Sequence, residues 1–288
     1  MSLFKSASIF RLLEAPANME QSMPAFAPLG ASTAVLSAGW VPPRGHAHGA
    51  LVESTSPLVS LAKLAIETKS VPAREVAKRV DAAVAQIEQE QGRKPGKKER
   101  RELKDEAVTA LLPHAFAKRK DVSVLIHVAQ GLVIIDAASG GALDTTLSAL
   151  VAAGVRLEPI QTSRSPASLM ANILLSGEGS FFVGNECELR AVDGSKARVS
   201  FKNHGLLNKE IQDHLQQGKQ VAQLALADEH GTEFVLTDAM TLKKLRFATP
   251  EVEGSASDSF DADALLEGSA LTLLATALVD VLNEGAEQ

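Results

Sequence analysis

A short basic segment lies between two stretches with the hydrophobic spacing of helices, and it constrains the fold more than any other feature of the chain. Residues 93–101 read Arg-Lys-Pro-Gly-Lys-Lys-Glu-Arg-Arg, with six cations within nine residues. Upstream, apolar residues recur at helical spacing from Pro72 to Gly92, and a second such segment runs from Lys98 to Leu112 and stops at Pro113. The pattern predicts a helical hairpin whose connecting tip carries the basic residues.

The charge is distributed unevenly along the chain. The formal net charge is -6, yet no Lys or Arg occurs from Thr249 onward, so residues 1–248 are basic on balance. A chain that segregates its signs can present a positive surface to a negatively charged partner. Phosphate of a nucleic acid is one interpretation of the basic tip, and a solvated charged turn is the other; the residues alone leave both open.

Length and composition set the class of protein. A chain of 288 residues with 45% hydrophobic content can bury a sizeable core, and we expect two or three compact units. We expect a cytoplasmic protein without a membrane partner, because we find neither a signal peptide nor an apolar run of about 18 residues. The single cysteine, Cys187, excludes an intrachain disulfide and is interpreted as a small core residue.

The remaining pattern alternates strands and helices. A turn-rich region with the only tryptophan, Trp40, separates strands at Leu3–Leu13 and Leu58–Ile66, and Trp40 is interpreted as a core residue rather than a base-stacking one. Beyond the hairpin we expect strands at 122–128, 132–136, 155–160, 188–192, 197–201, 221–226, 233–237 and 242–247, and helices from Ser165-Pro166, at 143–151 and 206–217, and, after an acidic loop, at 269–282. The sequence predicts an α+β protein with a helical insertion.

The search for catalytic motifs finds none of the common phosphate-loop, zinc-protease or serine-hydrolase signatures. His46 and His48 form a weak candidate pair for a metal, without a third ligand in register. A metal-dependent nuclease is the alternative function, using the scattered Asp136, Asp238, Asp261 and Asp263, although acidic residues at strand ends and turns are more often capping or solvated groups. We therefore expect no enzyme activity, no catalytic residue, no metal and no cofactor.

Seven short blocks carry a resemblance. They are Phe26-Ala27-Pro28-Leu29-Gly30, Gly39-Trp40-Val41-Pro42-Pro43, Leu103-Lys104-Asp105-Glu106, Leu111-Leu112-Pro113-His114-Ala115-Phe116, Gly218-Lys219 with Leu224-Ala225-Leu226, Leu242-Lys243-Lys244-Leu245-Arg246-Phe247, and Phe260-Asp261-Ala262-Asp263. In this order, across nearly the whole chain, they resemble the recombination-associated protein RdgC family of bacteria.

The resemblance implies two sheet-containing α/β units with a protruding helical-hairpin tip, assembled as a ring-shaped homodimer with a positive central hole. It implies a central domain of residues 1–70 plus 117–163, a tip (finger) domain of residues 71–116 and a base domain of residues 164–288. It also implies binding of double- and single-stranded DNA without sequence preference, association with the nucleoid, and antagonism of the RecA recombinase in homologous recombination. Phe116 matches the phenylalanine at the gate where the family's tips meet; the alternative is a buried anchor for the end of the hairpin.

The candidate DNA-binding residues are all basic. Arg93 and Lys94 match basic tip residues of the family, Lys202 matches a basic residue after a hairpin, and the basic run 118–120 follows the gate position. The full set is Arg93, Lys94, Lys97, Lys98, Arg100, Arg101, Lys118, Arg119, Lys120, Lys202 and Lys219. The chain departs from the pattern of the family at two places. Pro95-Gly96 interrupts a basic helical stretch that is continuous in known members of the family, and position 114 is His where the family has Arg.

A protein that encircles DNA needs cations facing the phosphates rather than side chains shaped to base edges, so binding is expected to be independent of sequence. With roughly six to eight phosphates neutralised, the affinity should fall about 10³-fold or more between 50 and 200 mM salt. The absence of tyrosine and an aromatic content of 4% argue against a base-stacking platform of the kind that single-strand binders use.

Overall fold

The computed structural model describes residues 2–45, 49–56, 59–248 and 256–284, which form two compact units. Unit 1 comprises Met1–Met23, Pro42–Lys63 and Val122–Gln288, and unit 2 comprises Pro24–Val41 and Leu64–Asp121. The division into central, tip and base domains stays a prediction.

The elements are, in chain order, β1 (Ser6–Glu14), η1 (Met19–Ser22), β2 (Leu36–Val41), β3 (Val52–Ser56), β4 (Val59–Lys69), α1 (Ala73–Gln91), α2 (Lys97–Leu111), η2 (Leu112–His114), β5 (Ala117–His127), β6 (Leu132–Ile135), α3 (Gly141–Ala152), β7 (Arg156–Pro159), α4 (Pro166–Ser176), β8 (Phe182–Arg190), β9 (Arg198–Lys202), α5 (Lys209–Gln216), β10 (Gln220–Ala227), β11 (Glu233–Thr237), β12 (Thr241–Arg246) and α6 (Ala256–Asn283).

A large antiparallel sheet organises unit 1, which confirms the expected mixture of helices and strands. The strand order is β2-β4-β5-β6-β1-β12-β11-β10-β8-β9, in which β2 belongs to unit 2. Outside this order, β3 pairs with β4 and β7 pairs with β1. The predicted hairpin of β5 and β6 is present: His127 lies opposite Leu132, and Gly131 takes a φ of 61° in the turn. The sheet thus joins the early and late parts of the chain within one unit.

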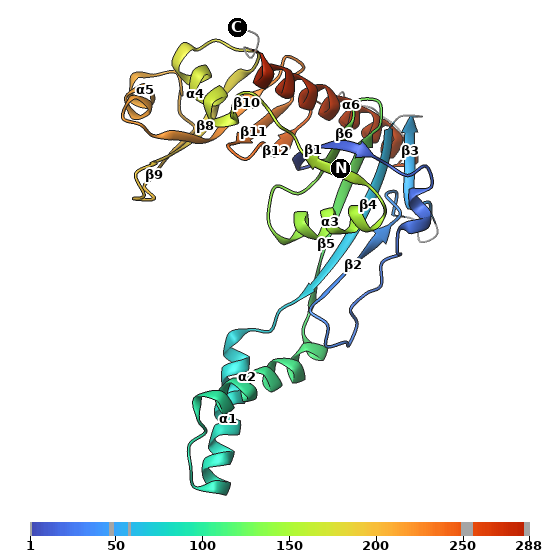
Figure 1. Cartoon of the computed structure of the whole chain (residues 1–288), viewed down its shortest axis with the longest axis vertical. Coiled ribbons are helices and arrows are strands. Elements are labelled where there is room, and N and C mark those ends of the chain that lie inside the picture. Colours follow the sequence, from blue (N-terminus) through green and yellow to red (C-terminus); the bar gives the residue numbers. More distant parts are fainter. Residues whose placement is uncertain (1, 46–48, 57–58, 249–255, 285–288) are drawn as a thin grey trace. The chain divides into compact units, whose positions relative to one another are not determined.

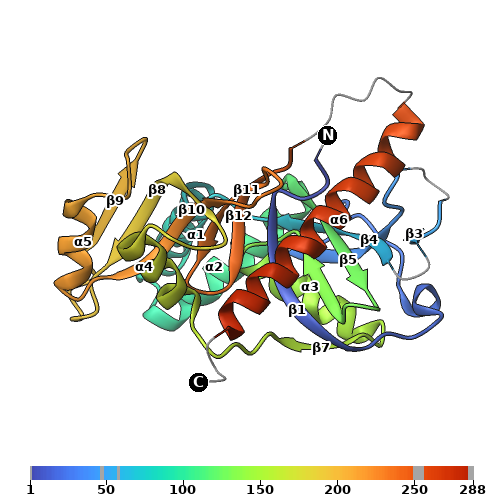
Figure 2. The same cartoon turned by 90° about the horizontal axis from the view of Figure 1, so that it is seen from above.

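The main core of unit 1 lies between one face of this sheet and the helices α4 and α6. Side chains alternate along the strands, so Leu224 of β10 and Phe234 of β11 point into the core with Met170 of α4 and Leu274 of α6. Figure 2 shows α6 running across the strands. Cys187 is buried in the same core, as expected, and burial raises the pKa of its thiol to about 12.

Helix α6 begins well before the predicted start at Ser269, so the acidic segment from Asp258 onward is helical rather than a loop. Within the described residues, Phe260–Asn283 is one helix long and apolar enough to cross a membrane by length and composition. Its Leu271, Leu274 and Leu278 are fully buried against the sheet. These contacts are those of a core helix.

Unit 2 contains the predicted helical hairpin. Along the chain α1 and α2 come after β4 and before β5, and the two helices lie side by side (Figure 1). Pro72 precedes α1, and Gly92 ends it in the left-handed region with a φ of 64°. Val76 and Val84 of α1 and Ala107 of α2 are buried, as the helical spacing predicted. Both helices and the break between them therefore follow from the sequence.

The region around Trp40 is a strand, β2, rather than the turn-rich segment that the prolines suggested. Its Gly39 is required sterically, because a Cβ at this position would lie 2.4 Å from the Cα of Phe26. The close approach allows Ala25 to bridge to Trp40, and Trp40 is only 1% exposed. The interpretation of Trp40 as a core residue is confirmed.

Candidate nucleic-acid interface

The turn between α1 and α2 gathers the basic segment at the beginning of a helix. Pro95 is buried, and α2 starts at Lys97, so that Lys97, Lys98, Arg100 and Arg101 all fall within its first five residues. The helix dipole already places partial positive charge at this end, and cations there destabilise a helix. The four cations concentrate positive potential at the turn at a cost to helix stability.

Some of these cations are held by nearby carboxylates. The guanidinium of Arg93 donates to both oxygens of Glu99, with N–O distances of 2.7 and 2.9 Å, and this contact lowers the pKa of Glu99. Glu99 also accepts a hydrogen bond from the amide of Gly96. Lys94 and Lys98 lie 4.0 Å from Glu88 and Glu102, respectively, in exposed and therefore weak pairs.

Lys97, Arg100 and Arg101 are exposed and have no ion-pair partner among the described residues. Among the described residues, they are the unpaired cations closest to the turn of the hairpin. Their proximity along α2 means that a phosphate backbone following the turn could contact several of them together.

The second basic group of unit 2, Lys118, Arg119 and Lys120, begins strand β5. All three are exposed, but Arg119 is engaged: it donates to Asp121 at 2.8 Å and lies over the ring of Phe26, 5.0 Å from its centroid. Helix α2 separates this group from the turn by about 22 Å, at 1.5 Å per residue. The two groups are therefore distinct, at opposite ends of one helix.

Phe116 lies between these features, immediately before β5, and its side chain is 93% exposed. An anchor for the hairpin would be buried, so the structure excludes the anchor interpretation for the single chain. The exposed ring is accessible to another molecule.

In unit 1, Lys202 and Lys219 lie on opposite sides of the sheet. Lys202 follows the buried Phe201 on β9 and points to the other face, next to the carboxylate of Glu186 across the strands. Lys219 is half-buried on the core side, where its Nζ lies 3.0 Å from Nδ1 of His214, which itself packs near Phe201. The structure thus does not bring these two predicted residues together.

The sheet face that carries Lys202 holds two cations that the sequence analysis missed, Lys244 and Arg246 of β12. Both line a hollow of about 940 Å³ on the face of the sheet opposite the core. The sequence signal for these cations was the segment Leu242-Lys243-Lys244-Leu245-Arg246, in which apolar and basic residues are interspersed. Its leucines are buried, and its cations at 244 and 246 are exposed.

The aspartates of the nuclease alternative have structural partners. Asp136 accepts hydrogen bonds from the amides of Lys5 and Ser6, Asp238 pairs with Arg190 at 2.8 Å, and Asp261 pairs with Arg44. Within the described part of the chain, no group of three or more His, Cys, Asp or Glu residues could hold a metal ion. His46 and His48 lie outside the described residues.

The chain is similar to known proteins over nearly its whole length. The family model described as "Putative exonuclease, RdgC" matches residues 2–285. The chain is 35% identical to the recombination-associated protein RdgC of Burkholderia cenocepacia, over 90% of this chain and 86% of that protein. The proteins of the same name from Burkholderia orbicola and Ralstonia nicotianae are 34% and 33% identical, each over 97% of this chain and 95% of the relative.

This chain belongs to the RdgC family. The match spans both units, including the hairpin and the strand β12 with its exposed cations. Its relatives are named for recombination, whereas the description of the family model names an exonuclease. Membership therefore places the chain among recombination-associated proteins and leaves the presence of an enzymatic activity to experiment.

Proposed function

We propose that this RdgC-family chain binds DNA without sequence specificity, encircling or coating the duplex as a ring-shaped homodimer, and thereby limits access of a RecA-type recombinase. The proposal is supported by Lys97, Arg100 and Arg101 at the start of α2, which have no ion pair within the described part of the chain and lie where the helix dipole adds to their charge. Such cations suit phosphates, and contacts with phosphates carry no sequence information. Double- and single-stranded DNA are both expected ligands, without nucleotide hydrolysis and in association with the nucleoid.

The test is a double charge reversal, Lys97→Glu with Lys98→Glu. Both side chains are exposed at the turn, so the fold should be kept while the attraction to phosphates is removed. We expect weaker binding to all duplex sequences alike and a shallower slope of log affinity against log salt, by about one for each phosphate that the variant no longer neutralises. Fluorescence anisotropy with two unrelated duplexes, between about 50 and 200 mM salt, measures both quantities.

The matched control reverses two exposed lysines of unit 1, Lys196→Glu with Lys209→Glu, which changes the net charge equally. The control should retain the salt slope of the wild type. Equal reductions in affinity in both double variants would show a general effect of net charge, and a reduction confined to one sequence would show base readout. Either result would contradict the proposal.

The nuclease alternative is tested by incubating the protein with plasmid and linear DNA in the presence of magnesium. Asp238 and Asp261 are engaged in ion pairs with arginines, so they do not favour this function. Sustained degradation that Asp238→Asn abolishes would nevertheless replace the proposal of a pure binding protein.

A further inference from the structure

Unit 1 leaves one face of its sheet open over the strands β8 to β12. Helices α4 and α6 pack on the opposite face, where the large apolar side chains of these strands point. On the open face the floor is made of small residues: a Cβ on Gly184 would lie 2.9 Å from the Cβ of Ala225, and Ala227 follows two residues later on the same strand face. Small side chains at the floor leave the hollow of about 940 Å³ and a flat surface beneath it.

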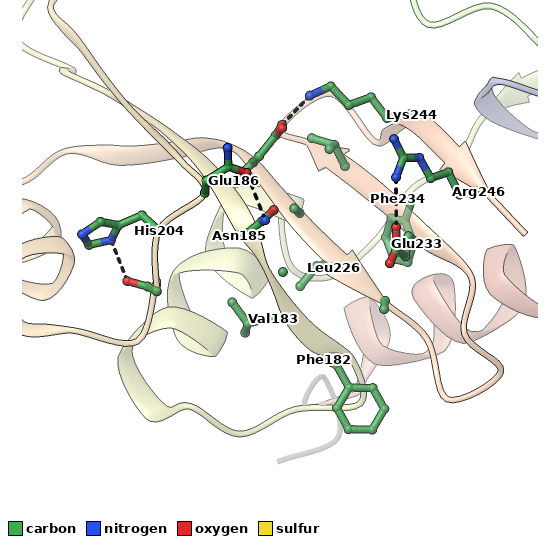
Figure 3. Close-up of a pocket in the computed structure, with 16 residues that line it drawn as sticks. Phe182, Val183, Asn185, Glu186, His204, Leu226, Glu233, Phe234, Lys244 and Arg246 are labelled. Atoms are coloured by element: carbon green, nitrogen blue, oxygen red, sulfur yellow. Dashed lines mark hydrogen bonds and ion pairs between the residues drawn. The ribbon is translucent and has the colours of Figure 1, made fainter. Parts of the chain in front are cut away.

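An exposed aromatic ring and a cation lie at the two ends of one row of paired residues in the hollow. Phe182 of β8 lies opposite Ala227, Ala227 opposite Glu233, and Glu233 opposite Arg246. The row crosses four neighbouring strands and therefore spans about 14 Å, at 4.7–4.9 Å per strand. Phe182 is 67% exposed although the ring is entirely apolar. Figure 3 shows Phe182 at one end of the hollow and Arg246 on the far side of it.

Exposed cations of the hollow can contact an anion. Lys244 is paired with Glu186, and Lys202 lies directly across the strands from the same carboxylate. Arg246 is 3.8 Å from Glu233 in a loose, exposed pair. The hollow is thus lined by two carboxylates and two cations, and each cation is more exposed than its acidic partner. Lys202 and Glu188 line the adjoining hollow.

Polar groups that can bond the edge of a base complete the lining. The amide of Asn185 donates to Asn203 at 3.3 Å, and the ring of His204 lies beside the carbonyl of Gly205, 2.8 Å away (Figure 3). Amides offer donors and acceptors together, so they can bond any of the four bases. A flat floor, an exposed phenyl ring, amides and exposed cations are the features of a site for an unpaired nucleotide.

We propose that the open face of β8–β12 binds a segment of single-stranded DNA, with a base stacked on Phe182 and the flanking phosphates at Arg246, Lys244 and Lys202. The inference rests on the proposed DNA-binding function and deepens it by assigning single strands a site separate from the basic turn of the hairpin. The low aromatic content argued against a platform of many rings, but one exposed ring is sufficient to hold one base.

The test compares Phe182→Ala with Phe182→Trp on a short oligothymidylate and on a duplex of equal length. Stacking of one base contributes about 1–3 kcal/mol, so Phe182→Ala should weaken binding of the single strand about fivefold or more and leave duplex binding unchanged. Phe182→Trp keeps an aromatic ring at this position and should bind the single strand with about the affinity of the wild type. Leu273→Ala is the matched control, because Leu273 is a similarly exposed apolar residue on α6, which covers the opposite face.

A second variant, Ala227→Leu, fills the floor of the hollow without altering any charge and should also weaken single-strand binding selectively. Unchanged single-strand affinity in Phe182→Ala, or equal reductions for single strand and duplex, would overturn the inference. A wild type that binds duplex but no single strand would overturn it, while the proposed binding and encirclement of duplex DNA would survive. A wild type that binds neither would overturn both.

Discussion

Phe116 is the residue whose exposure is hardest to explain within one chain. We predict that Phe116→Ser leaves the melting temperature of the dilute protein unchanged, because the exposed side chain stabilises nothing internally. If the phenyl ring of Phe116 is buried in a contact between the tips of two protomers, its removal should weaken dimerisation about tenfold or more. Thermal unfolding and mass measurement across a concentration series would report the two effects separately.

Leu36→Ser provides the control, since Leu36 is an exposed apolar residue of β2 in the same unit. It should leave both the melting temperature and the dimer unaffected. Unfolding of the Phe116 variant, or a dimer as tight as that of the wild type, would argue against the gate.

The sequence was more informative about burial than about partners at the level of single residues. Trp40 and Cys187 were correctly assigned to the core because large or sulfur-bearing apolar side chains are costly to expose. The engagement of Arg93 with Glu99 and of Arg119 with Phe26 depends on turns that only the fold defines. Nothing in the sequence pointed to Phe182, because the alternation of apolar and polar residues along a strand does not show which face of the sheet stays open.

At the scale of elements, a single carboxylate ties α6 to the beginning of β1. Glu267 is buried and accepts hydrogen bonds from the amides of Leu3 and Phe4, at 2.8 and 3.0 Å. Burial raises the pKa of Glu267, because the desolvation of the carboxylate outweighs these bonds, and the charge of Asp263 adds to the effect. A carboxyl with a raised pKa binds its proton more tightly in the folded state, so its contribution to stability is lost as the pH rises through the window above the ordinary glutamate pKa.

We predict that the wild type becomes more stable relative to Glu267→Gln as the pH falls from neutral to about 5. The glutamine keeps an oxygen for the two amides but carries no titrating group, and the other ionisable residues cancel in the comparison. Urea unfolding of both proteins at each pH measures the difference in unfolding free energy. Parallel pH profiles would show that Glu267 has the same pKa in the folded and unfolded chains.

The elements that the sequence predicted best are those with local signals at both ends. Helix α1 begins after Pro72 and ends at Gly92, and α4 begins after Ser165, whose hydroxyl accepts a hydrogen bond from the amide of Ser168. The missed strand β2 depends on the long-range fit of Gly39 against Phe26. The early start of α6 was hidden because its acidic residues bond to distant parts of unit 1, such as Arg44 and the N-terminal amides.

The assembly proposed for the whole molecule is a ring-shaped homodimer, and the alternative is a dimer that coats DNA without closing around it. A dimer that only coats DNA is held by contacts with phosphates, and counterion release makes these contacts weak at high salt. A closed ring is held on circular DNA by topology as well. The two assemblies therefore differ in how salt affects their release from circular and linear duplexes.

We predict that the protein, loaded at low salt, stays on closed circular plasmid when the salt is raised, but leaves the same plasmid after linearisation. Pull-down of plasmid, followed by quantification of bound protein, measures the retention, and nuclease cutting of the loaded circles supplies the internal control. Phe116→Ser should lose the retention on circles if it opens the gate, whereas Lys97→Glu with Lys98→Glu should reduce loading at low salt. Equal release from circles and linear molecules, or a stable monomer in solution, would exclude encirclement and leave a protein that coats DNA through its charges alone.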